Sequence, residues 1–206
     1  MVIEEIRSLA IPEVKIIRYK RFSDDRGYFT ETYRQYQFKE EFLRDFQIYQ
    51  INESKSRANV VRGLHIQWNP YMGKLVRTLY GHMVDLVVDV RVGSPTFGKG
   101  LMYDMPARLD ENYGEWIWVP VGFVHGNYYL QDSAIEYFCT GWWSPETEAG
   151  VNPYDKNIDW SLSDKSLVKQ FLSLKNKAIM SEKDRNAMSL TDWKKSSASK
   201  QFIYPQ

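Results

Sequence analysis

The strongest structural signal in this chain is Met83-Val84-Asp85-Leu86-Val87-Val88-Asp89-Val90-Arg91-Val92. Alternate positions place one set of apolar residues on a single face: Val84, Leu86, Val88, Val90 and Val92. The other face carries Asp85, Val87, Asp89 and Arg91. This period of two predicts a β-strand over Met83–Val92. Gly93-Ser94-Pro95 predicts the turn that ends it.

Similar short apolar segments follow this strand. They are Trp116–Val119, Val124–Leu130 and Ile135–Thr140. Turn-forming residues separate them: Pro120, Gly122 and Gln131-Asp132-Ser133. Several short strands with frequent turns predict a mainly β fold, either a sandwich or a barrel.

Helical signal is confined to the flanks of the β region. Phe38, Phe42 and Phe46 recur every four residues and predict a short amphipathic helix. A second helix is expected over Leu167–Leu174, and the lysine- and serine-rich tail after Trp193 is expected to be solvated and mobile. We therefore expect one domain over residues 1–206, with a β core at about 20–160 and a helical extension at about 161–206.

Composition excludes several classes of function. The 206 residues include 27 basic and 26 acidic side chains, so the net charge of +1 attracts neither nucleic acid nor a membrane surface. An anionic ligand must therefore be bound by locally placed cations. The single cysteine, Cys139, fits a reducing compartment, and the N-terminus is charged too early for a signal peptide. No apolar run approaches transmembrane length, and we expect a cytoplasmic protein.

The segment Val60–Gln67 places one histidine, His65, within an apolar, strand-like run. Imidazole takes or gives a proton near neutral pH. The nearby Arg62 and Lys74 are able to hold a phosphate or a developing oxyanion. These groups suit proton abstraction next to a carbonyl on an anionic substrate. A core histidine with two surface cations remains an equally acceptable interpretation of this segment.

The three histidines, His65, His82 and His125, lack the His-x-His pair typical of metal-binding cupins. A bound transition metal is therefore not expected, and one cysteine cannot form a zinc site. The sequence also has neither a phosphate-binding loop of the Gly-x-x-x-x-Gly-Lys-[Ser/Thr] type nor a Gly-x-Ser-x-Gly motif. These absences favour a histidine that acts as a proton carrier.

Nine motifs, in order from Asp25 to Asp184, resemble the dTDP-4-dehydrorhamnose 3,5-epimerase family. They are Asp25-Arg26-Gly27-Tyr28-Phe29-Thr30-Glu31, Gln50-Ile51-Asn52-Glu53-Ser54, Arg62-Gly63-Leu64-His65, Gly73-Lys74-Leu75-Val76, Asp85-Leu86-Val87-Val88-Asp89-Val90-Arg91, Gly93-Ser94-Pro95-Thr96-Phe97-Gly98, Val121-Gly122-Phe123-Val124-His125-Gly126, Ser144-Pro145-Glu146-Thr147-Glu148 and Ser181-Glu182-Lys183-Asp184. The resemblance implies a cupin-type jelly roll, usually a homodimer, that acts without a metal or other cofactor on a nucleotide-linked 4-keto-6-deoxy sugar.

The resemblance also implies the catalytic roles. His65 is expected to be the general base, and Asp184 is expected to pair with its far nitrogen. Lys74 is expected at the C4 oxygen, where negative charge develops in the enolate. Tyr137 is expected to return the proton from the other face. Because Tyr137 shares a strand face with Ile135 and Cys139, its ring is expected to lie partly in the core and partly in the cavity.

Substrate-binding positions follow from the same resemblance. Arg62, His125 and Lys183 match positions that meet the diphosphate or the sugar. The positions expected to contact the nucleotide or the edge of the sugar are Arg26, Glu31, Gln50, Asn52 and Glu148. Trp143 replaces a tyrosine that stacks on the thymine ring, and indole offers at least as much stacking surface. The segment around Arg26 is expected to reach the neighbouring subunit of a dimer.

The chain departs from the family pattern at Asn127, where phenylalanine is usual, and in an added segment before Ser181. Arg62 and His65 also fall on opposite faces of a regular strand, so a kink or bulge at Gly63 is required. Four functions remain open: 3,5-epimerisation, 3-epimerisation alone, a related ketoisomerase, and a non-catalytic sugar-nucleotide binder. The ketoisomerase is expected to carry a His-x-His-like pair, which this chain lacks.

Overall fold

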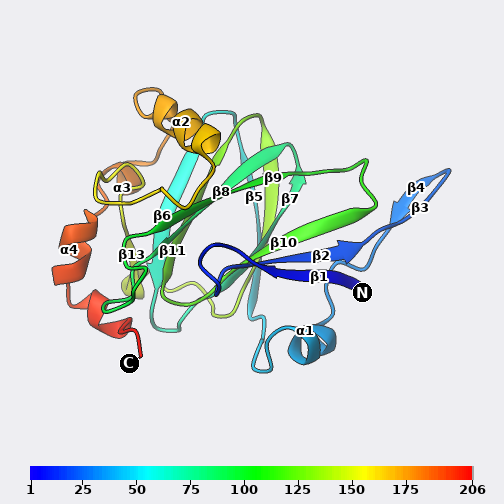
Figure 1. Cartoon of the computed structure of the whole chain (residues 1–206), viewed down its shortest axis with the longest axis horizontal. Helices are drawn as coiled ribbons and strands as arrows, with labels where there is room; N and C mark the ends of the chain where they lie inside the picture. Colours follow the sequence, from blue (N-terminus) through cyan, green and yellow to red (C-terminus); the bar gives the residue numbers. More distant parts are fainter. Residues whose placement is uncertain (206) are drawn as a thin grey trace.

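Two antiparallel sheets pack face to face in this protein, of which the computed structural model describes residues 1–205 (Figure 1). One sheet has six strands in the order β1-β2-β10-β7-β12-β5. Their bounds are β1 Ile3–Ser8, β2 Lys15–Lys20, β10 Tyr113–Val119, β7 Lys74–Tyr80, β12 Ser133–Cys139 and β5 Gln50–Ser56.

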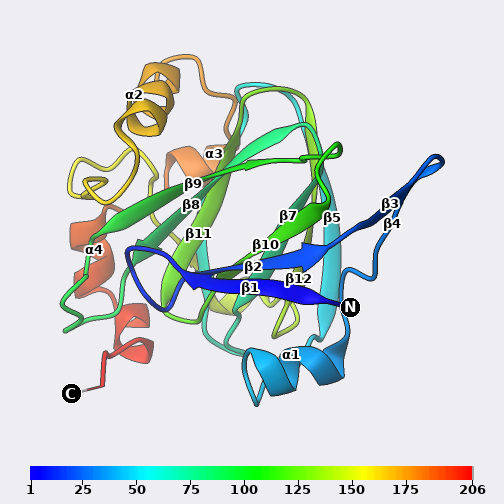
Figure 2. The same cartoon turned by 45° about the vertical axis from the view of Figure 1, so that its right-hand side comes forward.

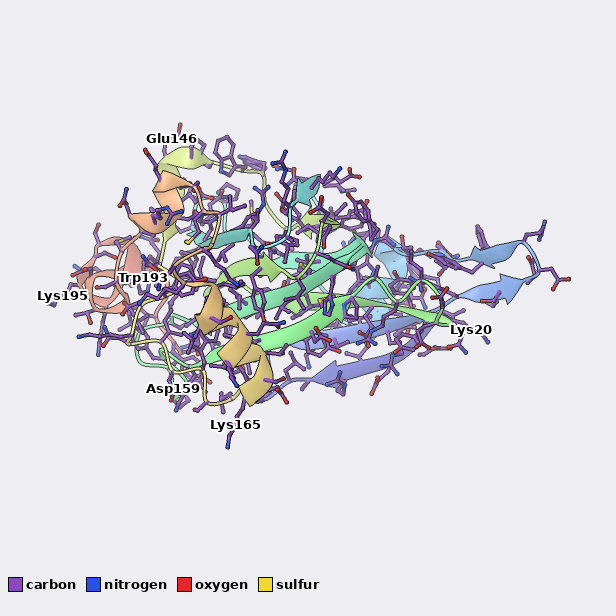
Figure 3. All side chains as sticks on the ribbon, turned by 90° about the horizontal axis from the view of Figure 1, so that it is seen from above. Lys20, Glu146, Asp159, Lys165, Trp193 and Lys195 are labelled. Carbon is purple, nitrogen blue, oxygen red and sulfur yellow. The ribbon has the colours of Figure 1, made fainter. Side chains whose placement is uncertain are left out.

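The second sheet has five strands in the order β13-β6-β11-β8-β9. Their bounds are β13 Glu148–Gly150, β6 Val61–Gln67, β11 Phe123–Tyr129, β8 His82–Asp89 and β9 Gly100–Pro106. A separate hairpin of β3 (Phe22–Asp24) and β4 (Gly27–Phe29) projects away from the body, as Figures 1 and 3 show. The mainly β, jelly-roll prediction is confirmed, since the paired sheets are antiparallel throughout.

Helices cover the two outer faces of the sandwich (Figure 2). The α-helices are α1 Gln35–Glu41, α2 Lys165–Leu174, α3 Glu182–Arg185 and α4 Leu190–Lys195, and the 3₁₀ helices are η1 Pro145–Thr147 and η2 Ala198–Gln201. The predicted helix over Leu167–Leu174 corresponds to α2, in which Phe171 and Leu174 are buried and the Asp164 side chain accepts a hydrogen bond from the Ser166 N–H. None of the helices in residues 1–205 is long and apolar enough to cross a membrane.

The strand predicted over Met83–Val92 is present but ends at Asp89. The Asp89 carboxylate ends it, because it accepts hydrogen bonds from the Arg91 N–H at 3.0 Å and from two hydroxyls of the following turn at 2.6 Å each. Both faces of β8 are buried. One face packs against the C-terminal helices through Leu86 and Val88, and the other packs between the sheets through Val87.

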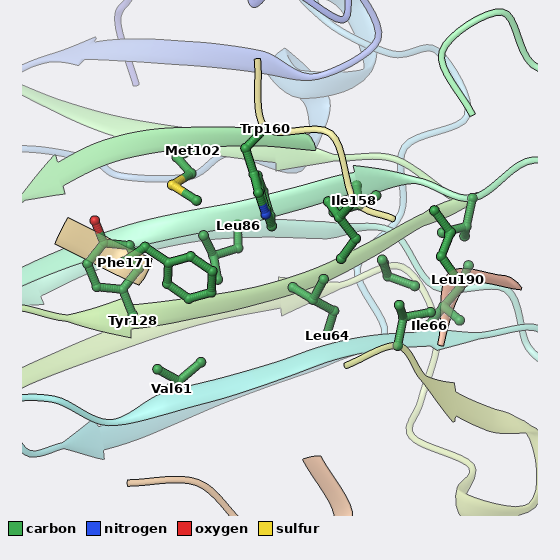
Figure 4. Close-up of a cluster of buried hydrophobic side chains, with 14 of the residues drawn as sticks. Val61, Leu64, Ile66, Leu86, Met102, Tyr128, Ile158, Trp160, Phe171 and Leu190 are labelled. Carbon is green, nitrogen blue, oxygen red and sulfur yellow. The ribbon is translucent and has the colours of Figure 1, made fainter. Parts of the chain in front are cut away.

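The C-terminal extension forms the outer layer over the five-stranded sheet (Figure 4). Phe171, Leu190 and Trp193 join Val61, Leu64 and other strand residues in one buried cluster. The lysines of the tail, Lys194, Lys195 and Lys200, are exposed as predicted, but the tail is held against the sheet. Trp193 is fully buried and donates a hydrogen bond to the Val90 carbonyl at 2.9 Å, and the Val92 N–H donates to the Phe202 carbonyl at 2.8 Å.

The helix predicted from Phe38, Phe42 and Phe46 is shorter than their spacing suggests. It contains only Phe38, and Phe42 is its C-cap. All three rings nevertheless pack together against Trp118 on the outer face of the six-stranded sheet. The spacing of four between these phenylalanines reflects their burial in one aromatic cluster, which continues past the end of the helix.

Candidate active site

A cavity of about 480 Å³ lies between the two sheets. Its walls carry seven of the residues expected in the active site: Arg62, His65, Lys74, His125, Tyr137, Lys183 and Asp184. Arg62, His65 and His125 come from the five-stranded sheet, on β6 and β11, and α3 supplies Lys183 and Asp184. Lys74 and Tyr137 come from β7 and β12 of the six-stranded sheet. The cavity therefore has two walls of different chemistry.

A bulge in β6 allows Arg62 and His65 to share one wall. On the neighbouring strand β11, His125 pairs with His65 and Asn127 pairs with Arg62, so β6 has one extra residue over this interval. Gly63 has a φ of +94°, and a Cβ there would lie 2.7 Å from the His125 carbonyl oxygen. Only glycine fits this position without displacing backbone. The irregularity expected at Gly63 is confirmed.

His65 and Asp184 form a close pair at one end of the cavity. The Nε2 atom of His65 lies 2.7 Å from the Asp184 carboxylate, whose other oxygen accepts the Gly63 N–H at 3.3 Å. Asp184 is positioned by α3, where the Ser181 hydroxyl accepts a hydrogen bond from its N–H at 3.1 Å. The side chain of His65 is 27% exposed and that of Asp184 is 7% exposed. Because Nε2 faces Asp184, Nδ1 is the nitrogen left for a ligand.

Lys74 and Tyr137 occupy the opposite wall. Lys74 pairs in register with Cys139, two residues beyond Tyr137 on the same face of β12. Within residues 1–205, the Lys74 ammonium forms neither a hydrogen bond nor a salt bridge, whereas the Tyr137 hydroxyl has the Asn52 amide as a polar neighbour. Tyr137 also packs against the inter-sheet core that includes Ile135, as its strand parity predicted.

Burial changes the acidity of the groups in both walls. Burial alone raises the pKa of Asp184, but the hydrogen bonds from His65 and Gly63 outweigh it, so its pKa lies below the usual value. Burial lowers the pKa of Lys74, although the nearby Cys139 and acidic groups oppose this effect. Burial raises the pKa of Tyr137. At neutral pH these directions favour an ionised Asp184 and a protonated Tyr137.

The remaining charged residues of the cavity differ in how they are paired. His125 Nε2 lies 2.8 Å from the carboxylate of Asp85, and both side chains are buried. Lys183 pairs with Glu148, which also borders a small pocket next to Lys74. Arg62 bonds only to neutral groups, the Ser56 hydroxyl at 2.8 Å and the Lys55 carbonyl at 3.1 Å. An anionic ligand would therefore find an uncompensated guanidinium in this wall.

Three expected binding residues lie beside the cavity. Asn52 is the cross-strand neighbour of Tyr137. The Gln50 side chain donates a hydrogen bond to the Asn52 amide oxygen at 2.9 Å and accepts one from the backbone N–H of Trp143 at 2.8 Å. Trp143 is 56% exposed, so its ring is free to stack on a ligand.

Arg26 and Glu31 lie outside the cavity of their own chain. Arg26 is at the tip of the projecting hairpin, where its side chain is 89% exposed and pairs with Asp24 at 2.6 Å. Glu31 pairs with Arg34 and with the N-terminal amino group. The structure therefore does not bring these two residues to the site that the other expected residues share.

Two features of the site were missed from the sequence. Asp85 was assigned no role, although a carboxylate inside an apolar strand signals a buried partner, here His125. Asn127 lines the cavity but was treated only as a departure from the family pattern. As for metals, no group of three His, Cys, Asp or Glu side chains within the described chain is placed to hold an ion.

Comparison with known proteins agrees with this geometry. The family model for dTDP-4-dehydrorhamnose 3,5-epimerase matches residues 8–192. The chain belongs to the dTDP-4-dehydrorhamnose 3,5-epimerase family. A member of this epimerase family from Pseudomonas aeruginosa is 38% identical over 187 residues, which cover 89% of this chain and 94% of that protein.

Two further relatives bear on substrate and outcome. A structure from Legionella pneumophila, described as a dTDP-6-deoxy-D-glucose-3,5-epimerase in complex with dTDP-4-keto-L-rhamnose, superposes with a TM-score of 0.81. It shares 31% identity, and the match covers 98% of each chain. A dTDP-4-dehydrorhamnose 3-epimerase from Streptomyces niveus is 36% identical over 161 residues, covering 75% of each protein. The likeness thus includes enzymes described as 3,5-epimerases and others described as 3-epimerases or 3'-monoepimerases.

Proposed function

We propose that this protein converts dTDP-4-dehydro-6-deoxy-D-glucose into dTDP-4-dehydro-L-rhamnose by inverting C3 and C5. The observation that carries the proposal is the separation of two sets of groups across one cavity. The His65–Asp184 pair lies on one wall, and Lys74 and Tyr137 lie on the other. Inversion requires proton removal from one face of the sugar and proton return to the opposite face.

His65 removes the proton in this mechanism. Its Nδ1 takes the hydrogen of C3, and the electron pair of the broken C–H bond moves into the C3–C4 bond to form an enolate. Asp184 holds the ring through Nε2 at 2.7 Å and stabilises the positive charge that the imidazole gains. The imidazolium then releases this proton to solvent, which restores the neutral base, and the same steps operate at C5.

Lys74 stabilises the enolate oxygen at C4. An ammonium group without a protein partner is a strong hydrogen-bond donor for an oxyanion in a water-poor cavity. Burial lowers the pKa of Lys74, so the protein's own groups do not fully compensate its charged form. Negative charge that develops on the sugar supplies this compensation, and the benefit is greater in the transition state than in the ground state.

Tyr137 returns the proton from the other face. Its hydroxyl donates to the carbanionic carbon, and the tyrosinate regains a proton from solvent. The raised pKa of Tyr137 keeps the hydroxyl protonated over the working pH range.

Binding of the nucleotide diphosphate uses the cations of the cavity and its rim. Arg62 offers a guanidinium that no carboxylate of residues 1–205 pairs with, and guanidinium suits the diphosphate. His125 and Lys183 contact the diphosphate or the sugar. Gln50, Asn52 and Glu148 hold the nucleotide or the edge of the sugar, and the exposed Trp143 stacks on the base.

The working form in this proposal is a homodimer. The β3–β4 hairpin projects from the body and carries the exposed Phe22, Tyr28 and Phe29 (Figure 3). Exposed aromatic residues on a protruding hairpin favour docking against another surface. Such docking would bring Arg26 and Glu31 to the partner's cavity. Sedimentation as a monomer at concentrations where the enzyme is active would contradict this part of the proposal.

Two parts of the proposal have alternatives. Inversion at C3 alone is an alternative because a relative described as a 3-epimerase is also similar to this chain. A ketoisomerase or a non-catalytic binder has less support, because neither requires proton-transfer groups on opposite walls. The cytoplasmic location stays a prediction, which rests on the single cysteine.

Proton NMR in deuterium oxide with the dTDP-4-keto-6-deoxyglucose substrate tests the proposed function. Loss of both the C3 and the C5 signals is expected from double epimerisation. Loss of the C3 signal alone would indicate a 3-epimerase, and no exchange would favour a binder. The His65→Asn variant is the control, because it keeps a polar side chain but lacks the base, and its exchange is expected to fall by about 10²–10⁴-fold.

A further inference from the structure

Asn127 is a buried polar residue in the wall that also carries His65. It lies on β11, is 4% exposed and lines the cavity. In register it pairs with Arg62 on one side and with Asp85 on the other. A buried amide next to a ligand cavity is costly unless its donors and acceptor find partners.

The neighbouring Tyr129 fixes the orientation of this amide. Tyr129 is fully buried, and its hydroxyl donates a hydrogen bond of 2.8 Å to Asn127 Oδ1. The amide oxygen is therefore occupied, and the NH₂ group is the end left for the cavity. In the part of the chain that the structure describes, Asn127 Nδ2 has no hydrogen-bond partner.

The charges around Asn127 indicate what this NH₂ group would bind. The partner must offer an oxygen acceptor, because NH₂ only donates. Asp85 is the residue of the neighbouring strand β8 that lies opposite Asn127, so a phosphate bound at Asn127 would meet a negative charge. Arg62 lies opposite Asn127 on the other neighbouring strand, β6, and its uncompensated guanidinium is the better site for the diphosphate. A neutral hydroxyl close to the diphosphate therefore suits Asn127 best.

We propose that Asn127 is a specificity-determining residue whose Nδ2 donates to the hydroxyl oxygen on C2 of the sugar. The assignment rests on the proposed function, in which the diphosphate is attached at C1 and the reacting carbons are C3 and C5. C2 is the hydroxyl-bearing carbon next to C1, so its oxygen is close to a diphosphate held by Arg62. Tyr129 acts as a positioning residue, because its hydroxyl keeps the NH₂ group turned toward the ligand.

The experiment compares the normal substrate with its 2-deoxy analogue. The measured quantity is kcat/KM for deuterium exchange at C5, because the substituent on C2 has little electronic effect at that carbon. The wild type, Asn127→Leu and Tyr129→Phe are assayed with both compounds. Leucine resembles asparagine in size but lacks the amide, and phenylalanine lacks only the hydroxyl of Tyr129.

We expect the wild type to prefer the hydroxylated substrate by about tenfold or more, as is typical for a buried hydrogen bond. Asn127→Leu should reduce this preference to within about threefold of unity, because the variant has no NH₂ group that is left without an acceptor when the 2-deoxy analogue binds. Tyr129→Phe should give an intermediate preference, because the freed amide turns either end to the ligand. A purely structural role would change rate and thermal stability but not the ratio between the two compounds.

Each outcome separates this inference from the proposed function. A wild type that fails to exchange the normal substrate would refute the proposed function itself. A wild type that exchanges it but shows no preference would refute the role of the C2 hydroxyl. An Asn127→Leu variant that keeps the wild-type preference would show that Nδ2 does not read this hydroxyl. If Asn127→Leu does not fold, the Tyr129→Phe ratio decides, and an unchanged ratio counts against the inference.

Discussion

Replacing Asp184 by asparagine separates the contribution of the carboxylate from that of the histidine it holds. The Asp184 carboxylate lies 2.7 Å from His65 Nε2, and its side chain is only 7% exposed. A hydrogen bond to a charged group contributes about 1.5–3 kcal/mol. When His65 gains a proton, two unit charges about 4 Å apart interact by about 4 kcal/mol at an effective dielectric constant near 20.

These energies set the expected loss of rate. Losing about 1.5–4 kcal/mol of transition-state stabilisation slows exchange by roughly 10- to 1,000-fold. Some activity should survive, because the base itself remains. Asparagine also cannot serve both neighbours as an acceptor: if its oxygen accepts the Gly63 N–H, its NH₂ group faces His65. The nucleotide affinity should change little, since the carboxylate acts mainly after proton transfer.

The assay is proton exchange at C3 and C5 in deuterium oxide, with the dTDP affinity measured in parallel. Asp104→Asn is the matched control, because Asp104 pairs with His82 away from the cavity. The pKa of Asp184 is lowered, so its charge is present above the usual carboxyl range and is lost only as pH falls through the lowered value. The Asp184 charge should therefore contribute to the rate throughout the neutral pH range. An Asp184→Asn variant that exchanges within threefold of wild type would refute the pairing as a source of catalysis.

Three further predictions concern Lys74, Tyr137 and metals. Burial lowers the pKa of Lys74 and raises that of Tyr137, so Lys74 should be the first of the two to lose its proton as pH rises. The wild-type rate should therefore fall at a pH below 10.5, the ordinary pKa of lysine, and Lys74→Arg should move this fall to higher pH. Lys74→Met should abolish exchange yet raise Tm by a few degrees, since it removes a half-buried, unpaired charge; a lower Tm would contradict this. In Tyr137→Phe, deuterium exchange should persist better than net inversion, and an equal fall in both would remove Tyr137 as the acid. Activity should survive dialysis against a strong chelator, and a loss reversed by one divalent ion would revive a metal-dependent mechanism.

The strands could be predicted from the sequence because burial imposes a period of two on them. This period does not predict where a strand ends. The strand through Met83 stops at Asp89 because that carboxylate captures the donors of the following turn, an interaction that apolar periodicity does not register. The anchoring of the C-terminal tail was missed for a related reason. Trp193 and Phe202 anchor it to the sheet as isolated side chains within a lysine- and serine-rich segment, and two anchors produce no period.

The residues proposed for the candidate site were named only with the help of a family resemblance. The sequence alone placed Arg62, His65 and Lys74 near one another, because they lie within thirteen residues. It could not place Tyr137 and Asp184 with them, since strand order within a sheet depends on long-range pairing that no local pattern encodes. The position of Asp184 became clear only from the packing of α3 against β6, which gives the 2.7 Å contact with His65.

The two-sheet architecture explains why proton removal and proton return can be separated by mutation. His65 is fixed by β6 and α3, whereas Tyr137 is fixed by β12 and the aliphatic residues between the sheets. A change at the Tyr137 hydroxyl alters neither the bulge at Gly63 nor the contact between His65 and Asp184. The bulge, in contrast, joins two functions in one wall, because the same irregularity turns Arg62 and His65 into the cavity. Substitutions at Gly63 should therefore impair anion binding and proton abstraction together. In the opposite wall, substitutions at Lys74 should impair stabilisation of the enolate, and substitutions at Tyr137 should impair the return of the proton.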